Sequence, residues 1–493
     1  MKGREGRAEI DIAPQEFRRI GHKLVDDVAT FLEGIGARPV APGKLPSEVR
    51  ALLGERDIPE NGADPATILA EATELLFANS TFNGHPRFFG YITASATPIG
   101  ILSEMLAATV NSNVGAWQLS PAATEIELTT VRWMAQLTGF PDSCGGIFVS
   151  GGNMANMVCF LAAKAKIMRE PDDPSRYARL RCYASAETHT WIDKAADIAG
   201  LGRDNIRHLA IDAEGRVSAS ELRDMLEADR KAGLVPFLVI ATAGTTNTGA
   251  TDPVSEMADI CEEYGVWLHV DGAYGAPVAA LPGASADLRA IARADSLAID
   301  PHKWLYAPLE AGCALVRDRS ELERTFSHTP HYYHFDDVEG EKGTNFYELG
   351  PQNSRGFRAL KVWLAMKQVG RAGYVKMIGD DIVLAEAMFD AVKDTPSLEP
   401  FTCELSIVTF RYVPKDLRRS ARESTEYLNR LNEELISALQ NGGEVFLSNA
   451  TIDGRFLLRA CIVNFRTMME DVRAVPEIVV RVGERVDALL RPR

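Results

Sequence analysis

Two side chains that could act together in chemistry each follow a short apolar segment. Asp271 ends the run Val266-Trp-Leu-His-Val-Asp271, and Lys303 comes shortly after Leu297–Ile299, in Asp300-Pro-His-Lys303-Trp. Such runs predict buried strands of a parallel sheet, and open α/β sheets bind ligands where these strands end. A lysine at a strand end is usually a solvated charge, but burial lowers the pKa of the amine and makes it a nucleophile.

A carboxylate and a lysine at neighbouring strand ends are the two groups that pyridoxal phosphate (PLP) needs. The lysine forms a Schiff base with the cofactor. The carboxylate keeps the pyridine nitrogen protonated, so that the ring can accept an electron pair released from Cα. We therefore expect Lys303 to be the cofactor lysine and Asp271 to face the pyridine nitrogen. The ordinary alternative for Asp271 is that it caps the following turn.

The composition is that of a globular protein with two or three domains. The chain has 493 residues, 46% of them hydrophobic and 25% charged. Its net charge of −15 argues against nucleic acid or an anionic membrane as a partner. Seven scattered cysteines without CxxC spacing predict reduced core residues, not disulfides or metal ligands. We expect no secretory signal and no spanning apolar segment, and therefore a cytoplasmic protein. We also expect no metal site.

The hydrophobic pattern divides the chain into three parts. Residues 1–85 are expected to form an N-terminal helical segment, with helices at 14–35 and from Pro65 to about Phe77. Residues 86–372 alternate between short apolar runs and helical stretches, which predicts an α/β domain with a mostly parallel sheet. The predicted strands are 147–149, 182–184, 237–241, 266–270, 297–299 and 313–316. Residues 373–493 predict a smaller α+β domain, with strands near 405–412 and 457–465.

Four motifs in this order carry a resemblance to a known family: His85-Pro-Arg-Phe-Phe89, Ser120-Pro-Ala-Ala-Thr-Glu125, His269-Val-Asp271 and Asp300-Pro-His302-Lys303-Trp304. The chain resembles the PLP-dependent group II amino-acid decarboxylases, and among them most the aromatic-L-amino-acid decarboxylases. The resemblance implies the fold-type-I, aspartate-aminotransferase-like fold of PLP-dependent transferases. This fold has helices on both faces of its sheet and a smaller C-terminal domain. It also implies a homodimer in which residues 1–85 pack across the partner.

A phosphate-binding turn is expected at Ser150-Gly151-Gly152-Asn153, between a strand and a helix. Glycines let the backbone approach an anion, and free N–H groups at a helix start bind it. A Gly-Gly turn alone is a weak signal, but beside Lys303 and Asp271 it indicates the cofactor phosphate. The family usually has Ser-Glu where this chain has Asn153-Met154. We therefore expect the Asn153 amide or a backbone N–H to replace the hydroxyl.

Asp300 and His302, which precede Lys303, are also expected near the phosphate. The carboxylate of Asp300 lies close to where a dianion should bind, so it needs a compensating donor or must point away. His302 could bond the phosphate or relay a proton.

The resemblance assigns further residues to the cofactor ring and to proton transfer. His189 matches the histidine that stacks on the ring, Thr246 a residue near its opposite edge, and Ala273 a further cofactor contact. A His-, Asp- and Gly-rich stretch from about 326 to 347 predicts a mobile loop that closes over the site. Its Tyr332 matches the tyrosine that protonates Cα after carbon dioxide leaves. Tyr333 is adjacent, so the match could slip by one residue.

An aromatic segment near residue 89 is expected to bind the substrate side chain. The resemblance implies substrate contacts from Phe89, Tyr91, Thr93 and Trp117, the last from the partner's 113–117 stretch. Asn113 and Gly115 stand where aromatic-specific members carry bulky apolar groups. The plainer interpretation of these aromatics is a hydrophobic core.

We expect decarboxylation of an L-amino acid, with an aromatic one favoured, to the amine and carbon dioxide. Three alternatives use the same scaffold: decarboxylation of an acidic or diamino acid, aldehyde synthesis, and aminotransfer. Tyr332 opposes aldehyde synthesis, whereas Arg411 in the smaller domain keeps aminotransfer open. An inactive binding protein is opposed by the intact Lys303, Asp271 and His189.

Overall fold

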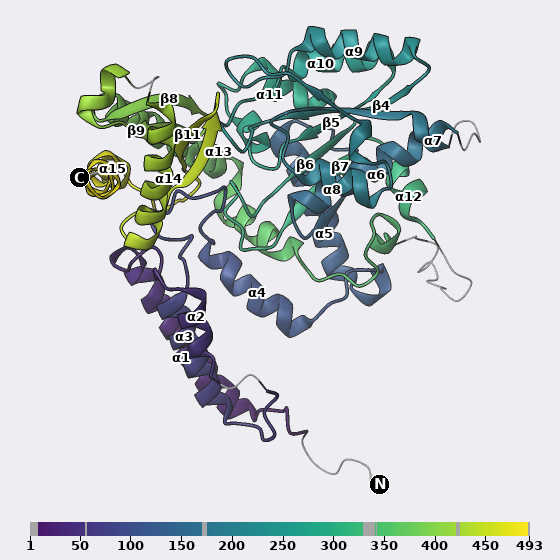
Figure 1. Ribbon diagram of the computed structural model, residues 1–493. Coiled ribbons are helices and arrows are strands. Elements are labelled where there is room, and N and C mark those ends of the chain that lie inside the picture. Colours follow the sequence, from purple (N-terminus) through teal and green to yellow (C-terminus); the bar gives the residue numbers. More distant parts are fainter. Residues whose placement is uncertain are drawn as a thin grey trace.

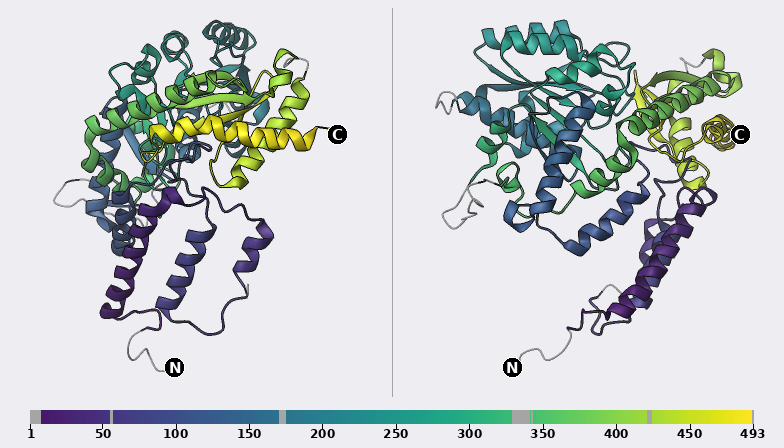
Figure 2. Two further views of the ribbon diagram at one scale, coloured as in Figure 1. Left: turned by 90° about the vertical axis from the view of Figure 1, so that its left-hand side faces the viewer. Right: turned by 180° about the vertical axis from the view of Figure 1, so that it is seen from behind.

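The computed structural model describes residues 8–54, 57–169, 175–328, 341, 343–420 and 424–491. These residues form two β-sheets, and three N-terminal helices extend away from both (Figures 1 and 2). Across the described ranges, every helix is too short or too polar to pass through a lipid bilayer.

The larger sheet has seven strands in the order β1-β7-β6-β5-β4-β2-β3. The strands are β1 (Gly145–Val149), β2 (Leu180–Ser185), β3 (Ile206–Leu209), β4 (Val235–Thr242), β5 (Trp267–Asp271), β6 (Ser296–Ile299) and β7 (Gly312–Val316). From β6 through β5, β4 and β2 to β3 all pairings are parallel, whereas β7 runs antiparallel to both of its neighbours. The predicted α/β class with a mostly parallel sheet is confirmed.

Alternate residues of the strands enter two cores, one on each face of this sheet. In β4, Val239 and Ala241 belong to one core, and Leu238 and Ile240 belong to the other. The first core includes residues of α5 (Pro121–Thr138), α9 (Ala219–Lys231), α10 (Val254–Tyr264) and α11 (Ala286–Ala290). The second includes residues of α6 (Gly152–Met168), α8 (Trp191–Ile198) and α12 (Arg319–Phe326), and the short α7 (Arg176–Arg179) precedes β2. Burial on both faces explains why these strands read as continuous apolar runs.

A long helix, α13 (Ala359–Lys393), leads from the larger sheet to the smaller one. It is kinked at Gly370, whose φ of 67° is not helical. The smaller sheet is antiparallel, in the order β10-β11-β9-β8. Its elements are β8 (Leu398–Glu404), β9 (Ile407–Tyr412), α14 (Thr425–Gly442), β10 (Ser448–Ile452), β11 (Arg455–Cys461) and α15 (Met469–Leu490). The proposed domain boundary at 372/373 falls within α13, close to this kink.

The C-terminal strands differ from the sequence expectation in number and position. Residues 405–412 were predicted as one strand, but Leu405 has a φ of 53° and lies in the turn between β8 and β9. The second predicted strand, 457–465, starts and ends later than β11. The strands β8 and β10 were not predicted.

The N-terminal segment consists of α1 (Pro14–Gly34), α2 (Pro46–Leu52) and α3 (Pro65–Asn79). The Asp64 carboxylate accepts the N–H of Thr67 at 3.0 Å, as expected for an Asp-Pro helix start. α1 and α3 meet through the stacked rings of Phe31 and Phe77, 4.2 Å apart. Neither helix has a fully buried residue, so this segment has little core of its own in a single chain.

Candidate active site

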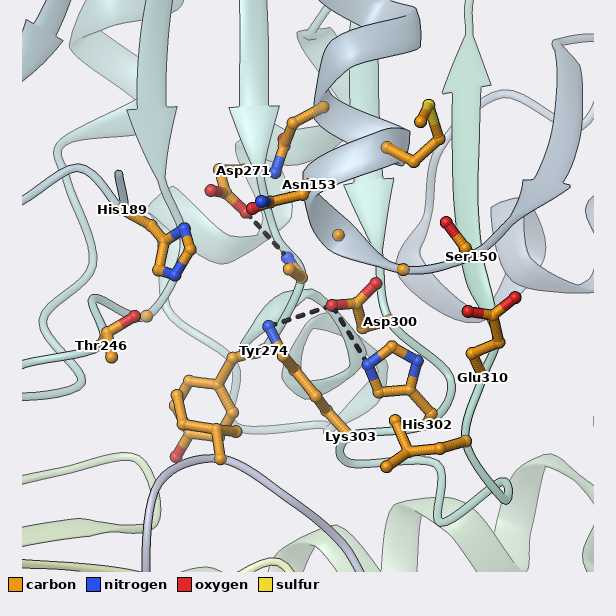
Figure 3. A pocket seen from close by; sticks show the side chains of 18 of the residues that line it. Ser150, Asn153, His189, Thr246, Asp271, Tyr274, Asp300, His302, Lys303 and Glu310 are labelled. Atoms are coloured by element: carbon orange, nitrogen blue, oxygen red, sulfur yellow. Dashed lines mark hydrogen bonds and ion pairs between the residues drawn. The ribbon is translucent and has the colours of Figure 1, made fainter. Parts of the chain in front are cut away.

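A cavity of about 570 Å³ lies where β4, β5 and β6 end and α6 begins (Figure 3). Every residue that the sequence assigned to the cofactor lines it: Gly151, Gly152, Asn153, His189, Thr246, Asp271, Ala273, Asp300, His302 and Lys303. Nine further residues line it as well: Ile92, Ser150, Met154, Asn156, Thr242, Gly244, Tyr274, Leu309 and Glu310. The topology thus gathers the ten residues assigned to the cofactor from five separate stretches of the chain: 151–153, 189, 246, 271–273 and 300–303.

Lys303 lies at the edge of this cavity, paired with a carboxylate. Its Nζ is 3.0 Å from Asp300 Oδ2, and Asp300 is almost fully buried (Figure 3). Burial opposes the charge of Lys303, but Asp300 and Asp271 favour it, and together they raise the pKa of the amine above its ordinary value. The expected lowering of this pKa is therefore wrong, because the nearby carboxylates outweigh desolvation.

His302 contacts the same carboxylate from the other side. Its Nε2 lies 3.7 Å from Asp300 Oδ2, and its Nδ1 accepts the N–H of Ala311 at 3.1 Å. Burial lowers the pKa of His302 despite the neighbouring Asp300. An Nδ1 that accepts an amide leaves the proton of the neutral ring on Nε2, which faces Asp300.

The glycines at the start of α6 lie too close to neighbouring side chains for any residue with a Cβ to replace them. A Cβ at Gly152 would collide with Asp300, and one at Gly151 would press on His302. Gly151 also has a φ of 146°. The first N–H groups of α6 have no partner within the helix, so this end of the cavity suits an anion. Ser150, the first residue of the expected turn, also lines the cavity and adds a hydroxyl that was not assigned as a donor.

Asp271 ends β5 and points into the opposite side of the cavity (Figure 3). Its Oδ1 accepts the N–H of Ala273 at 3.2 Å, so it does cap the following turn. Its Oδ2 accepts the indole N–H of Trp191 at 2.7 Å. The turn-capping interpretation and the cofactor interpretation are therefore compatible. Trp191 was not predicted, because it lies 80 residues away in the sequence.

His189 lies on the wall of the cavity, between Asp271 and Thr246 in the view of Figure 3. Its Nδ1 accepts the backbone N–H of Trp191 at 3.3 Å. Burial lowers the pKa of His189, outweighing the opposite effect of Asp271. A neutral imidazole can stack on an aromatic ring. Thr246 is exposed and also lines the cavity, so its hydroxyl is accessible to a bound group.

The four residues proposed for the substrate do not line this cavity in the single chain. Phe89 is fully buried in the core of the smaller domain, so its assignment to the substrate needs correction: the plainer core interpretation holds there. Tyr91 is 56% exposed and Thr93 half-buried. Trp117 donates its indole N–H to Glu125 at 2.8 Å. For these three, a substrate contact remains a prediction.

Local contacts explain why Asn113 and Gly115 stand where aromatic-specific family members carry bulky apolar groups. The Asn113 side chain accepts the N–H of Arg355 at 3.0 Å. A Cβ at Gly115 would collide with the carbonyl oxygen of Asn353. Arg355 itself is buried in an ion pair with Glu127. The 113–117 stretch is therefore fixed against residues 345–355, and no bulky group fits at position 115.

The loop tyrosines Tyr332 and Tyr333 lie outside the described residues. Among the residues that are described, no cluster of three or more His, Cys, Asp or Glu could hold a metal ion.

The residues present fit pyridoxal phosphate. The hydroxyl of Thr242, a buried group on the cavity wall, has no hydrogen-bond partner within the described chain. A carboxylate, a lysine and a glycine-lined helix start occupy different sides of one cavity. On a mostly parallel sheet, this arrangement defines a PLP-dependent enzyme of fold type I.

Comparisons with known proteins identify the family. The model of the pyridoxal-dependent decarboxylase conserved domain matches residues 46–413. The aromatic-L-amino-acid decarboxylase of Bacillus atrophaeus is 36% identical over 481 residues, 97% of each chain. The phenylacetaldehyde synthase of Petunia hybrida is 30% identical, with 91% of this chain and 90% of that protein covered. The structure of Oryza sativa TDC with PLP and tryptamine matches with a TM-score of 0.89 at 27% identity, covering 97% of this chain and 99% of that one.

The chain belongs to the pyridoxal-dependent decarboxylase family. It is a PLP-dependent amino-acid decarboxylase, as its sequence predicted, and pyridoxal phosphate is its cofactor.

Proposed function

We propose that this protein decarboxylates an aromatic L-amino acid to the corresponding amine, as a homodimer. The observation that carries the catalytic part is the placement of Lys303 and Asp271 on one cavity, beside the glycine-lined start of α6. The aromatic class is supported by the Bacillus atrophaeus relative, named for aromatic amino acids, and by the Oryza sativa structure, which holds tryptamine.

When bound, PLP supplies an aldehyde for the substrate amine and a ring that accepts the electron pair left by carbon dioxide. The N–H groups at the start of α6, the Ser150 hydroxyl and His302 Nε2–H would donate to its phosphate. Asp271 would hold a negative charge at the pyridine nitrogen, and His189 would lie against the ring. Lys303 would bind the aldehyde and later release the product amine.

Proton transfer at Lys303 has a defined route. The amine must lose a proton before it can attack an aldehyde, and its raised pKa means that it starts protonated. Asp300 Oδ2, 3.0 Å from Lys303 Nζ, would accept this proton, and His302 Nε2 lies 3.7 Å from the same oxygen. We assign the return of a proton to the substrate Cα to Tyr332, on the family resemblance.

The dimer is supported by apolar surface on the single chain. On α4 (Pro98–Val110), Leu102, Met105, Leu106 and Val110 are each more than half exposed. Contiguous exposed apolar residues of this kind mark interaction sites in soluble proteins. The helices α1 and α3, which have little core of their own, would gain one on a partner.

The deciding experiment offers purified holoenzyme a panel of aromatic, acidic and basic L-amino acids and measures carbon dioxide and amine. We expect release from aromatic substrates and its loss in Lys303→Ala. Lys376→Ala, which removes an exposed lysine paired with Asp380, is the matched control and should keep activity. Preference for glutamate or a diamino acid would refute the aromatic assignment. A Lys303→Ala enzyme that still bonds PLP covalently would refute the role of Lys303.

A further inference from the structure

Trp191 contacts both residues proposed to hold the cofactor ring. It is the first residue of α8 and is only 1% exposed. Its indole Nε1 donates to Asp271 Oδ2 at 2.7 Å, and its backbone N–H donates to His189 Nδ1 at 3.3 Å. The ring packs edge-on against His269, 5.7 Å away at 88°, which fixes the direction of the indole N–H.

The indole bond changes what the Asp271 carboxylate can do. With the Ala273 amide on Oδ1 and the indole on Oδ2, each carboxylate oxygen accepts one hydrogen bond. Donors to a carboxylate favour its charged form and make it a weaker base. Each oxygen keeps a lone pair for a further donor, so neither bond prevents contact with a pyridinium N–H. A weaker base leaves more of the shared proton on the pyridine nitrogen.

The backbone bond acts on His189. As the first residue of α8, Trp191 has an N–H with no partner in the helix, so it is free to donate. An amide that donates to Nδ1 requires that nitrogen to be unprotonated, which places the proton of the neutral ring on Nε2. The buried, neutral His189 is thereby held in one tautomer and one orientation.

We infer that Trp191 is a positioning residue that holds the Asp271 carboxylate as a hydrogen-bond acceptor for the cofactor and thereby keeps the pyridine nitrogen of PLP protonated. The inference rests on the proposed role of Asp271. It predicts that removing the indole N–H shifts the shared proton from the nitrogen towards the carboxylate. The electron sink is weakened, although every group that touches the cofactor is still present.

The test is Trp191→Phe, which removes the indole N–H but keeps an aromatic ring and the backbone N–H to His189. The readout is the ¹⁵N chemical shift of PLP labelled at the pyridine nitrogen, measured in the holoenzyme at fixed pH. We expect the shift to move towards the value of an unprotonated pyridine. The kcat should fall about tenfold to a hundredfold, the effect of losing one hydrogen bond to a charged group, while KM stays near its wild-type value.

Trp267→Phe is the matched control. Trp267 is also a buried tryptophan, on β5, and its indole donates to Ser296 Oγ at 2.8 Å instead of to Asp271. This variant should leave the ¹⁵N chemical shift of the pyridine nitrogen unchanged, even if it lowers the midpoint temperature of unfolding. If Trp191→Phe loses stability but keeps the wild-type shift, Trp191 is structural only and the inference is wrong.

Asp271→Asn separates failure of this inference from failure of the proposed function. If Asp271→Asn keeps the wild-type shift and rate, the assignment of Asp271 to the nitrogen fails, and the inference fails with it. If Asp271→Asn moves the shift and Trp191→Phe does not, only the inference about Trp191 is overturned.

Discussion

At the residue scale, the distinctive feature of the site is the carboxylate of Asp300. It lies beside the start of α6, where an anion is expected, and it is paired with Lys303 and near His302. Two negative groups at one site repel each other, and a bound phosphate would lie near the Asp300 carboxylate. The Asp300 carboxylate should therefore oppose tight binding of the phosphate.

Asp300→Asn tests this opposition. The amide keeps the shape of the carboxylate without its charge, so we expect PLP to bind about tenfold more tightly. The dissociation constant is measured by adding PLP to protein from which it has been removed. Glu310→Gln is the control, because Glu310 also lines the cavity but pairs with Arg358. Weaker binding in Asp300→Asn would mean that Asp300 supports the phosphate.

Tyr332→Phe tests the proton donor. The variant keeps the aromatic ring but lacks the acid, so amine formation should fall about a hundredfold while carbon dioxide release falls less. Dioxygen can then oxidise the carbon that lacks its proton, and water releases it as aldehyde, with ammonia and hydrogen peroxide as by-products. Amine, aldehyde and peroxide are measured together. Tyr333→Phe should behave as wild type, and aldehyde from that variant alone would place the acid at position 333.

Much of the cofactor site is predictable because its residues sit in short local motifs at strand ends. Lys303, Asp271 and the Gly151–Gly152 turn were found in this way, and all line the cavity. Trp191 was not found, because its contact with Asp271 depends on how α8 packs against β5. The pKa of Lys303 was predicted in the wrong direction, since a sequence gives no distance to a carboxylate.

At the element scale, the six predicted strands of the larger sheet share one property: they are buried on both faces. The missed strand, β3, lies at the edge of the sheet, and polar Arg207 and His208 form its centre. A short edge strand of this kind has no apolar run to reveal it. The strand expected at 405–412 began too early because Leu405 gives no sign of a turn, whereas glycine or asparagine is usual at such a φ.

α13 holds the segment that follows the cofactor lysine through one buried carboxylate. Asp381 Oδ2 accepts the indole N–H of Trp304 at 2.9 Å and the hydroxyl of Tyr306 at 2.7 Å. Trp304 also stacks on Tyr274, a residue of the cavity wall, at 4.8 Å. Burial raises the pKa of Asp381 from 3.8 to about 7, although both donors act in the opposite direction.

Asp381→Asn should therefore change how stability depends on pH. The folded protein keeps a proton on Asp381 up to about pH 7, whereas the unfolded chain loses it near 3.8. The free energy of unfolding of the wild type thus falls as pH rises through this window, by on the order of 1–4 kcal/mol from this group. The asparagine variant lacks this loss, so its stability relative to wild type should rise between pH 5 and pH 7.

Urea midpoints at several pH values measure this effect. Asp380→Asn is the control, because Asp380 is exposed and paired with Lys376 on the same helix. Parallel curves for Asp381→Asn and wild type would show that the carboxylate is not protonated in the folded protein.

At the scale of the whole molecule, the single chain leaves apolar surface unused. The helices α1–α3 extend from the body (Figure 2), and Phe17, Ile68 and Leu76 are at least half exposed. The exposed face of α4 adds four further apolar residues. The sequence predicted α1 from its periodicity and α3 from its Asp64-Pro65 start, whereas α2 was not predicted. Neither signal can distinguish packing on the main domain from packing on a partner.

Leu106→Glu with Val110→Glu tests the dimer. If α4 lies in the interface, burying two unpaired carboxylates there would strongly weaken the free energy of dimerisation, so we expect a monomer. Activity should fall with dimerisation, because Trp117 and the 113–117 stretch are proposed to reach the partner's substrate. Sedimentation equilibrium gives the mass of each variant, and the decarboxylation assay is run at the same protein concentration. Leu489→Glu, which places the same charge on an exposed leucine near the end of α15, should remain dimeric and active. A wild-type monomer with full activity, or a fully active monomeric double variant, would show that one chain suffices for catalysis.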